Sequence, residues 1–185
     1  MSRIGKKPIK FSNDVDVKID GSRVIVKGPK GELETIVDSA ITINVNEENN
    51  EKSIQLSFGE NTKDNRRKIG LYRSLISNNV DGVVSGYTKV INLVGIGYRA
   101  SLSGKKLELS LGYSHNVSVD PVDGVDFQVP SQNKIIISGI DKEKVGQQTV
   151  KISTLRKYDP YKGKGLLIEG KLYTKKQGKS VGKKG

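Results

Sequence analysis

Both halves of this sequence carry the same order of elements, a series of short extended segments followed by one helix. In the first half, alternating apolar and polar residues separated by turn residues predict strands over 22–27, 32–37, 41–45 and 53–58. From about Thr62 the apolar residues recur at spacings of three and four, which predicts a helix that ends near Gly82. This half therefore predicts a sheet covered by one helix.

The second half repeats this order. Short apolar runs predict strands over 106–111, 117–119, 125–129 and 134–138. A helix is predicted to follow Asp141, a residue suited to cap its first turn. Its buried face is expected to carry Val145, Thr149, Ile152 and Leu155. An additional pair of strands, 89–94 and 98–102, is expected around a bend at Gly95-Ile96-Gly97. The sequence thus predicts an internal duplication.

The predicted fold class is α+β, with two similar small domains and a basic C-terminal tail. A chain of 185 residues is long enough for two small domains. Each is expected to be an antiparallel-rich sheet packed against one helix, and we place them at residues 1–82 and 83–157. The tail, residues 158–185, has few apolar residues and is expected to be ordered mainly by what it binds.

The net charge of +12 lies almost entirely at the two ends of the chain. Residues 1–10 hold four basic and no acidic side chains, residues 11–150 hold 17 and 18, and residues 151–185 hold 11 and 2. A neutral body with two cationic ends predicts a polyanionic partner, either nucleic acid or an anionic membrane. The C-terminal end carries glycines where a membrane-binding helix needs bulky apolar residues, so nucleic acid is favoured and no membrane partner is expected.

The sequence offers little for catalysis. It has no cysteine and one histidine, His115, at the tip of a predicted hairpin, which excludes thiolate sites and Cys-His pairs. Residues 165–171 match the glycine and lysine spacing of a phosphate-binding loop, but Leu172 follows where a hydroxyl is required and no amphipathic helix comes next. We therefore expect no enzymatic activity, cofactor, metal or small-molecule substrate.

The start of the tail has the chemistry of an RNA-binding segment. Residues 157–165 interleave lysines, tyrosines and glycines, and further lysines follow. Ammonium groups neutralise phosphates, tyrosine rings stack on exposed bases, and glycines let a backbone approach closely. The alternative is a solvated, disordered basic tail, against which the aromatic content argues.

Five segments carry a resemblance to a known family. They are Met1–Ile9, Val26–Gly31, Gly95–Ala100, Leu111–His115 and Pro160–Gly165. In this order, and across essentially the whole chain, they resemble the bacterial-type large-subunit ribosomal protein six family. Any single segment is a weak signal, but five in the family's order are specific.

The resemblance implies a structural constituent of the large ribosomal subunit that stabilises rRNA tertiary structure for translation. Such a protein binds large-subunit rRNA near the factor-binding region, beside neighbouring ribosomal proteins at the stalk base. It works in the cytoplasmic ribosome of a bacterium, or in the ribosome of a plastid or mitochondrion. The expected rRNA-binding residues are Arg156, Lys157, Pro160, Tyr161, Lys162, Gly163, Lys164, Gly165, Lys171, Lys175, Lys176 and Lys179, with Arg3, Lys6 and Lys7 as a second, weaker anchor.

Two other classes of function stay open on the residues alone. A free RNA-binding module would share the basic tail but would not sediment with ribosomes after a high-salt wash. A phosphate-using enzyme would show saturable nucleotide binding.

Overall fold

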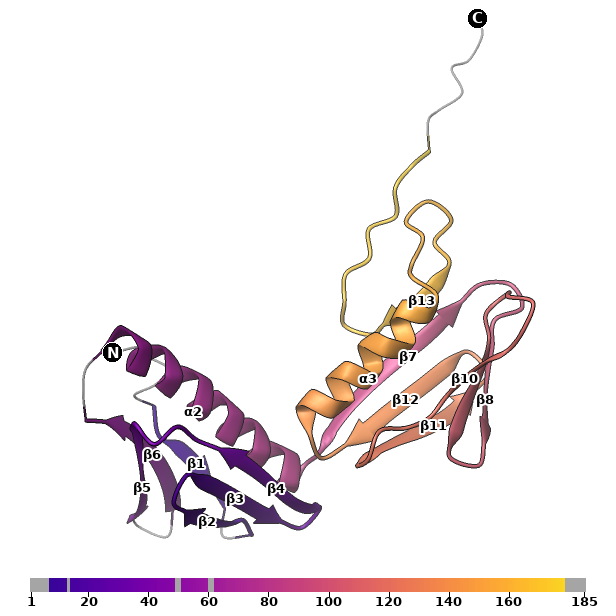
Figure 1. Ribbon diagram of the computed structural model, residues 1–185. Helices are drawn as coiled ribbons and strands as arrows, with labels where there is room; N and C mark the ends of the chain where they lie inside the picture. Colours follow the sequence, from indigo (N-terminus) through magenta and orange to yellow (C-terminus); the bar gives the residue numbers. More distant parts are fainter. Residues whose placement is uncertain (1–6, 13, 49–50, 60–61, 179–185) are drawn as a thin grey trace, which may run out of the picture. The chain divides into compact units, whose positions relative to one another are not determined.

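The computed structural model describes residues 7–12, 14–48, 51–59 and 62–178 (Figure 1). They fold into two compact units. The first unit contains the described residues up to Tyr87 together with Ile140–Lys142, and the second contains the rest. Both units combine antiparallel strands with one helix, which confirms the expected α+β class with two similar units.

The first unit has two three-stranded sheets and one helix. One sheet has the order β1 (Ile9–Phe11), β6 (Glu51–Phe58), β5 (Ile41–Glu48), and the other has the order β2 (Asp16–Asp20), β3 (Arg23–Gly28), β4 (Gly31–Ile36). Helix α2 (Lys63–Val84) packs against β1 and β6 of one sheet and β3 and β4 of the other. The sequence pattern missed β1 because it is only three residues long, and β2 because it exposes most of its side chains.

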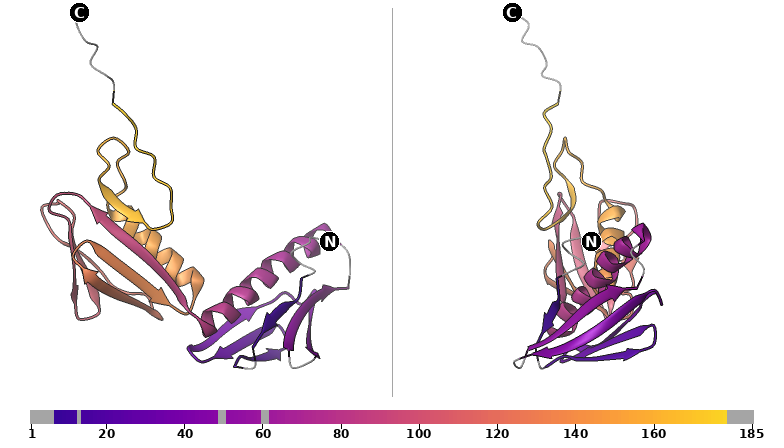
Figure 2. Two further views of the ribbon diagram at one scale, coloured as in Figure 1. Left: turned by 180° about the vertical axis from the view of Figure 1, so that it is seen from behind. Right: turned by 90° about the vertical axis from the view of Figure 1, so that its left-hand side faces the viewer.

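The second unit has a three-stranded and a four-stranded sheet. Its strands are β7 (Tyr87–Val94), β8 (Arg99–Ser103), β9 (Lys106–Ser110), β10 (Val117–Val119), β11 (Val125–Ser131), β12 (Lys134–Gly139) and β13 (Gly165–Ile168). The sheet orders are β10-β9-β8 and β11-β12-β7-β13. Helix α3 (Lys142–Leu155) runs along the β12–β7 part of the larger sheet (Figure 1 and the left view of Figure 2).

The two units repeat each other strand for strand. The order β1-β6-β5 matches β7-β12-β11, and β2-β3-β4 matches β8-β9-β10, with a helix following the sixth strand in each case. Strands β7 and β8 are therefore counterparts of β1 and β2 rather than additions to the second unit. They also do not pair with each other, because β7 lies in one sheet and β8 in the other. Strand β13 is the element with no counterpart among the described residues of the first unit.

The C-terminal end of α2 is held by the β3–β4 turn. The Lys30 backbone amide donates to the Val83 carbonyl oxygen at 3.0 Å, and its ammonium group donates to the Ser85 carbonyl oxygen. The helix continues past Gly82, the residue where the sequence pattern ended it, and stops before Gly86, whose φ of +73° suits the residue after a helix end. Gly82 itself lies against the backbone of Ile140, since a Cβ added there would be 2.3 Å from the Ile140 carbonyl oxygen.

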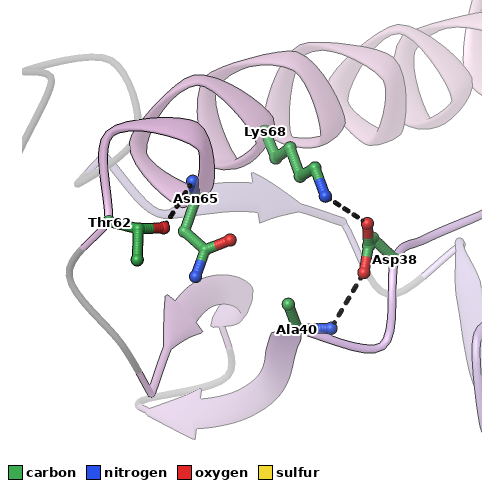
Figure 3. Close-up of polar contacts among 5 residues, drawn as sticks. All are labelled: Asp38, Ala40, Thr62, Asn65 and Lys68. Carbon is green, nitrogen blue, oxygen red and sulfur yellow. Dashed lines mark hydrogen bonds and ion pairs between the residues drawn. The ribbon is translucent and has the colours of Figure 1, made fainter.

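The N-terminal end of α2 is fixed by two polar contacts (Figure 3). The Thr62 hydroxyl accepts a hydrogen bond from the Asn65 amide at 3.2 Å, as an N-cap should. The Lys68 ammonium group lies 2.5 Å from Oδ2 of Asp38, and Oδ1 of the same carboxylate accepts a hydrogen bond from the Ala40 amide at 3.1 Å. These bonds hold the pKa of the Asp38 carboxyl below its usual value, and the same ion pair raises the pKa of Lys68.

Gly82→Ala should destabilise the first unit by about 2 kcal/mol or more, because the new methyl group would overlap a backbone oxygen. Gly70→Ala, in the same helix with no atom within 4 Å of the added Cβ, should instead stabilise it by about 0.5–1 kcal/mol. Amide hydrogen exchange of α2 in the full chain measures both. Equal effects of the two substitutions would contradict the assigned contact.

Asp38→Asn should lower the melting temperature of the first unit at pH 7, while the asparagine oxygen still accepts from the Ala40 amide. Because the pKa of the Asp38 carboxyl is lower in the folded state, the ionised carboxylate stabilises the fold at pH values above the unfolded-state pKa of about 3.9. This stabilisation is lost as the pH falls through the folded-state pKa. The pKa of Lys68 is raised in the folded state, so its ammonium group stabilises the fold fully below the unfolded-state pKa of about 10.4. This stabilisation disappears as the pH rises through the folded-state pKa of Lys68.

The measurement is thermal unfolding of wild type and variant from neutral to acidic pH. The two melting temperatures should converge in acid. Glu32→Gln, which removes a 3.9 Å pair with Lys27 between exposed side chains, serves as the control and should change little at any pH. A difference between wild type and Asp38→Asn that persisted at the acid end would contradict the assignment.

Candidate nucleic-acid interface

The second unit contains a hollow of about 580 Å³ built from four segments of the chain. These are the β7–β8 turn, the β9–β10 loop, the end of α3 and the loop that follows it. The lining residues are Ile96, Tyr98, Gly112, Tyr113, Thr154, Leu155, Arg156, Lys157, Asp159, Lys162 and Lys164. Three of the segments singled out in the sequence, 95–100, 111–115 and 160–165, thus contribute to one site.

The loop after α3 is organised by Asp159. Its Oδ1 accepts hydrogen bonds from the backbone amides of Tyr161 at 2.9 Å and Lys162 at 3.3 Å, which lowers the pKa of this carboxyl. The Asp159 amide donates to the Lys164 carbonyl oxygen at 2.8 Å, and the Gly163 amide donates to the Asp159 carbonyl oxygen at 2.8 Å. The loop is therefore closed by its own backbone, and it places three lysines, Lys157, Lys162 and Lys164, in the lining of the hollow.

Two glycines of this loop are required by its conformation. Gly163 has a φ of +69°, and Gly165 has a φ of +143°. A Cβ on Gly165 would lie 2.7 Å from the Cα of Tyr158, so the close approach of two parts of the loop excludes any side chain there. An intramolecular reason thus accounts for both glycines, and their approach to RNA stays a prediction.

The chain after the loop folds back onto the second unit. Strand β13 pairs antiparallel with β7, and Leu166 is only 1% exposed. The Ile168 amide donates to the Tyr173 hydroxyl at 2.9 Å, and the ring of Tyr173 lies 4.9 Å from that of Tyr158. The expectation that the tail is ordered mainly by what it binds is wrong for this stretch, because its apolar residues complete the sheet.

Arg156 is the most constrained cation of the hollow. Its Nε donates to the Tyr98 hydroxyl at 3.0 Å, and its guanidinium carbon lies 4.9 Å from the centre of the Tyr113 ring. The Tyr113 hydroxyl in turn donates to the Leu155 carbonyl oxygen at 3.0 Å. The contacts with both tyrosines raise the pKa of Arg156, so it stays cationic at any physiological pH.

The structure brings only part of the expected site together. Arg156, Lys157, Lys162 and Lys164 line the hollow. Pro160 and Tyr161 lie in the same loop, with Tyr161 58% exposed, and Pro160 accepts a hydrogen bond from the Lys176 amide at 2.9 Å. Three other lysines of the expected site, Lys171, Lys175 and Lys176, are exposed but do not line the hollow. Lys7 lies in the first unit, while Arg3, Lys6 and Lys179 fall outside the described residues.

Sequence reasoning left Asp159 out of the site, and it also left out several uncharged residues, of which three matter most for Arg156 and the lining. Tyr98 and Tyr113 hold Arg156, and Ile96, 89% exposed, stands at the lining of the hollow. All three belong to segments that carried the family resemblance. That resemblance was the signal available, because nothing in the local pattern indicates that these turns meet the end of α3.

The features weighed for other chemistry can be located in the described part of the chain. His115 is exposed, with Nδ1 3.4 Å from the hydroxyl of Ser114. Residues 165–168 form a strand, so the phosphate-loop spacing does not lead into a helix. Within the described ranges there is no group of three or more His, Cys, Asp or Glu that could hold a metal ion. Neither helix described there has the length and apolar character needed to span a membrane.

Comparison with known proteins gives consistent matches along the chain. The family described as "Ribosomal protein L6" matches residues 11–86, which belong to the first unit, and residues 94–167, which belong to the second unit apart from Ile140–Lys142. The chain is 47% identical over 185 residues to the "Large ribosomal subunit protein uL6" of Moorella thermoacetica, covering 100% of this chain and 99% of the relative. It is 47% identical over 185 residues to that of Clostridium beijerinckii and 44% identical over 184 residues to that of Synechococcus sp. (strain CC9605), with 100% of each chain covered.

Leu166→Ala should destabilise the second unit by about 2–5 kcal/mol, because it leaves a cavity where β13 packs on the sheet. Leu172→Ala, at a side chain 96% exposed, should change the stability by less than about 0.5 kcal/mol. Urea unfolding of the full chain measures the loss, and hydrogen exchange of the β7 amides assigns it to the second unit. If Leu166→Ala were as silent as Leu172→Ala, β13 would not belong to the folded unit.

Proposed function

Because the chain belongs to the ribosomal protein L6 family, whose members are proteins of the large ribosomal subunit, we propose that it binds large-subunit rRNA through the hollow of its second unit and the basic stretch around it. The bound RNA segment is held by its phosphates, and the protein stabilises the tertiary structure of the rRNA for translation. The role is structural rather than enzymatic.

The observation that carries this proposal is the composition of the hollow. Four cations, Arg156, Lys157, Lys162 and Lys164, share its lining with two tyrosines and a single carboxylate. Cations at this density attract phosphates, and the exposed ring of Tyr113 offers a surface for stacking, whereas Tyr98 is buried. The carboxylate of Asp159 is engaged by two backbone amides, which reduces its repulsion of a phosphate.

The corresponding region of the first unit, at the end of α2, differs from the hollow, and the difference supports the same assignment. The β3–β4 turn of the first unit is the counterpart of the β9–β10 loop, and it closes onto the end of α2 through the amide and ammonium groups of Lys30. In the second unit the longer β9–β10 loop contributes Gly112 and Tyr113 to an open hollow. The duplicated fold thus presents a filled site in one unit and an open, cationic one in the other.

The family resemblance extends the proposal to the protein's surroundings. We place it near the factor-binding region of the large subunit, beside neighbouring ribosomal proteins at the stalk base. The relatives named above are bacterial, which favours the cytoplasmic ribosome of a bacterium over that of a plastid or mitochondrion. Residues 3, 6 and 7 form a second, weaker RNA anchor in this proposal. Co-sedimentation with large subunits after a high-salt wash would distinguish a ribosomal protein from a free RNA-binding module.

Lys162→Ala should weaken binding to a large-subunit rRNA transcript and make the log–log salt slope shallower by about 0.7–0.9, since one phosphate contact is lost. Tyr161→Ala should weaken binding by about 1–3 kcal/mol with the slope preserved, because a stacking ring carries no charge. Affinities measured at several salt concentrations separate the two effects.

The matched control is Lys105→Ala. Lys105 is exposed in the turn before β9, whereas the hollow is reached from the other end of that strand. Its removal should leave both affinity and slope nearly unchanged. Equal losses from Lys105→Ala and Lys162→Ala would mean that RNA is held by diffuse charge rather than by this site.

A further inference from the structure

We propose that Arg156 is a pre-positioned phosphate fork, in which Tyr98 and Tyr113 hold the guanidinium so that its two terminal nitrogens bind two oxygens of one RNA backbone phosphate seated in the hollow. The inference rests on the proposed function and names the group that the hollow recognises. It also assigns Tyr98 and Tyr113 as positioning residues.

The first argument is the way the guanidinium is held. The Tyr98 hydroxyl takes the Nε hydrogen at 3.0 Å, and the Tyr113 ring lies under the guanidinium carbon at 4.9 Å. A hydrogen bond on Nε and a ring next to the guanidinium carbon together restrict the position of the group. A guanidinium restricted in this way loses less conformational entropy on binding a ligand than a free side chain does.

The second argument is that the two tyrosines are themselves fixed. Tyr98 is 8% exposed, and the Tyr113 hydroxyl donates to the Leu155 carbonyl oxygen at 3.0 Å. Gly95 makes room for the Tyr98 ring, because a Cβ at that glycine would lie 2.7 Å from the ring. Gly112, with a φ of +72°, brings the β9–β10 loop to the other side of the ring, where a Cβ would lie 3.4 Å from it. Gly95 is thus required by the placement of the Tyr98 ring, while Gly112 is required by the conformation of the β9–β10 loop that lies next to it.

The third argument is the unused hydrogen-bonding capacity of Arg156. A guanidinium has five N–H donors, of which the one on Nε is taken by Tyr98. Within the described residues no carboxylate lies within the 4.0 Å of an ion pair with Arg156, although the charge of Arg156 contributes to the lowered pKa of Asp159 in the same hollow. The four donors on the terminal nitrogens form the planar fork that matches two oxygens of a phosphate. Lys162 and Lys164 line the same hollow and add charge for the same anion.

The experiment uses substitutions that keep the charge and change the geometry. Arg156→Lys retains the cation but removes the fork, and Tyr98→Phe retains the ring but removes the acceptor of the Nε hydrogen bond. Binding of the full chain to a large-subunit rRNA transcript is measured at several salt concentrations for each variant and for the double variant. The controls are Arg67→Lys, at an exposed arginine of α2, and Tyr87→Phe, which loses a 2.9 Å hydrogen bond to the Asn78 carbonyl oxygen.

We expect Arg156→Lys to weaken binding about tenfold or more, and Tyr98→Phe about three- to tenfold, with the salt slope unchanged in both. Because Tyr98 acts through Arg156, the double variant should bind within about twofold of Arg156→Lys alone. The two controls should bind as wild type does. A merely structural role of Tyr98 would instead give losses that add in the double variant.

Two results would overturn the inference in distinguishable ways. If Lys162→Ala weakens binding while Arg156→Lys behaves like Arg67→Lys, the hollow binds RNA but Arg156 is only a point charge, and the proposed function stands without the fork. If wild type binds the rRNA transcript no better than an unrelated RNA of equal length, the proposed function fails and the fork fails with it. Arg156→Lys decides the matter even if Tyr98→Phe disturbs the fold, because it leaves both tyrosines in place.

Discussion

Each unit depends on one helix that buries one face, which is apolar in α2 and includes the polar Gln148 and Thr149 in α3. In the first unit the apolar face of α2 runs through Ile69, Ile76, Val80 and Val83, and it packs against strands of both sheets at once. A three-stranded sheet has one face to bury and too little area to form a core by itself. The helix therefore determines how the two sheets are placed relative to each other within a unit. It thereby also determines which turns between strands lie at the C-terminal end of the helix. In the second unit the hollow lies at that end of the helix.

Duplication of this arrangement supplied two equivalent helix ends, and the chain uses them differently. At the end of α2 the turn is short and its lysine caps the free carbonyls, which gives a closed and self-sufficient structure. At the end of α3 the corresponding loop is longer and a tyrosine hydroxyl takes the Leu155 carbonyl, while Arg156 and the loop after it remain open to solvent on one side. The same fold thus supports a purely structural end and a cationic one.

Sequence reasoning succeeded where the signal is local. The strands flanking the Gly28–Gly31 turn, the start of α2 at Thr62 and the start of α3 after Asp141 all follow from periodicity and capping. It failed for β13, whose four residues lie among lysines and glycines and whose partner strand lies far earlier in the chain. The grouping of Tyr98, Tyr113 and Arg156 was likewise out of reach, since it joins three segments that only the tertiary fold brings together. The charge of the site could be predicted, but its geometry could not.

Strand β13 lies at the edge of its sheet, yet its amides at Leu166 and Ile168 are already engaged by the Arg156 carbonyl and the Tyr173 hydroxyl. A sheet edge with free donors is a template on which the strand of another molecule can assemble. At β13 these donors are already bonded within the same chain, so no further strand can pair with them. The β13 edge is therefore closed to the addition of a strand from another copy of the chain, and this closure comes from residues of the same chain.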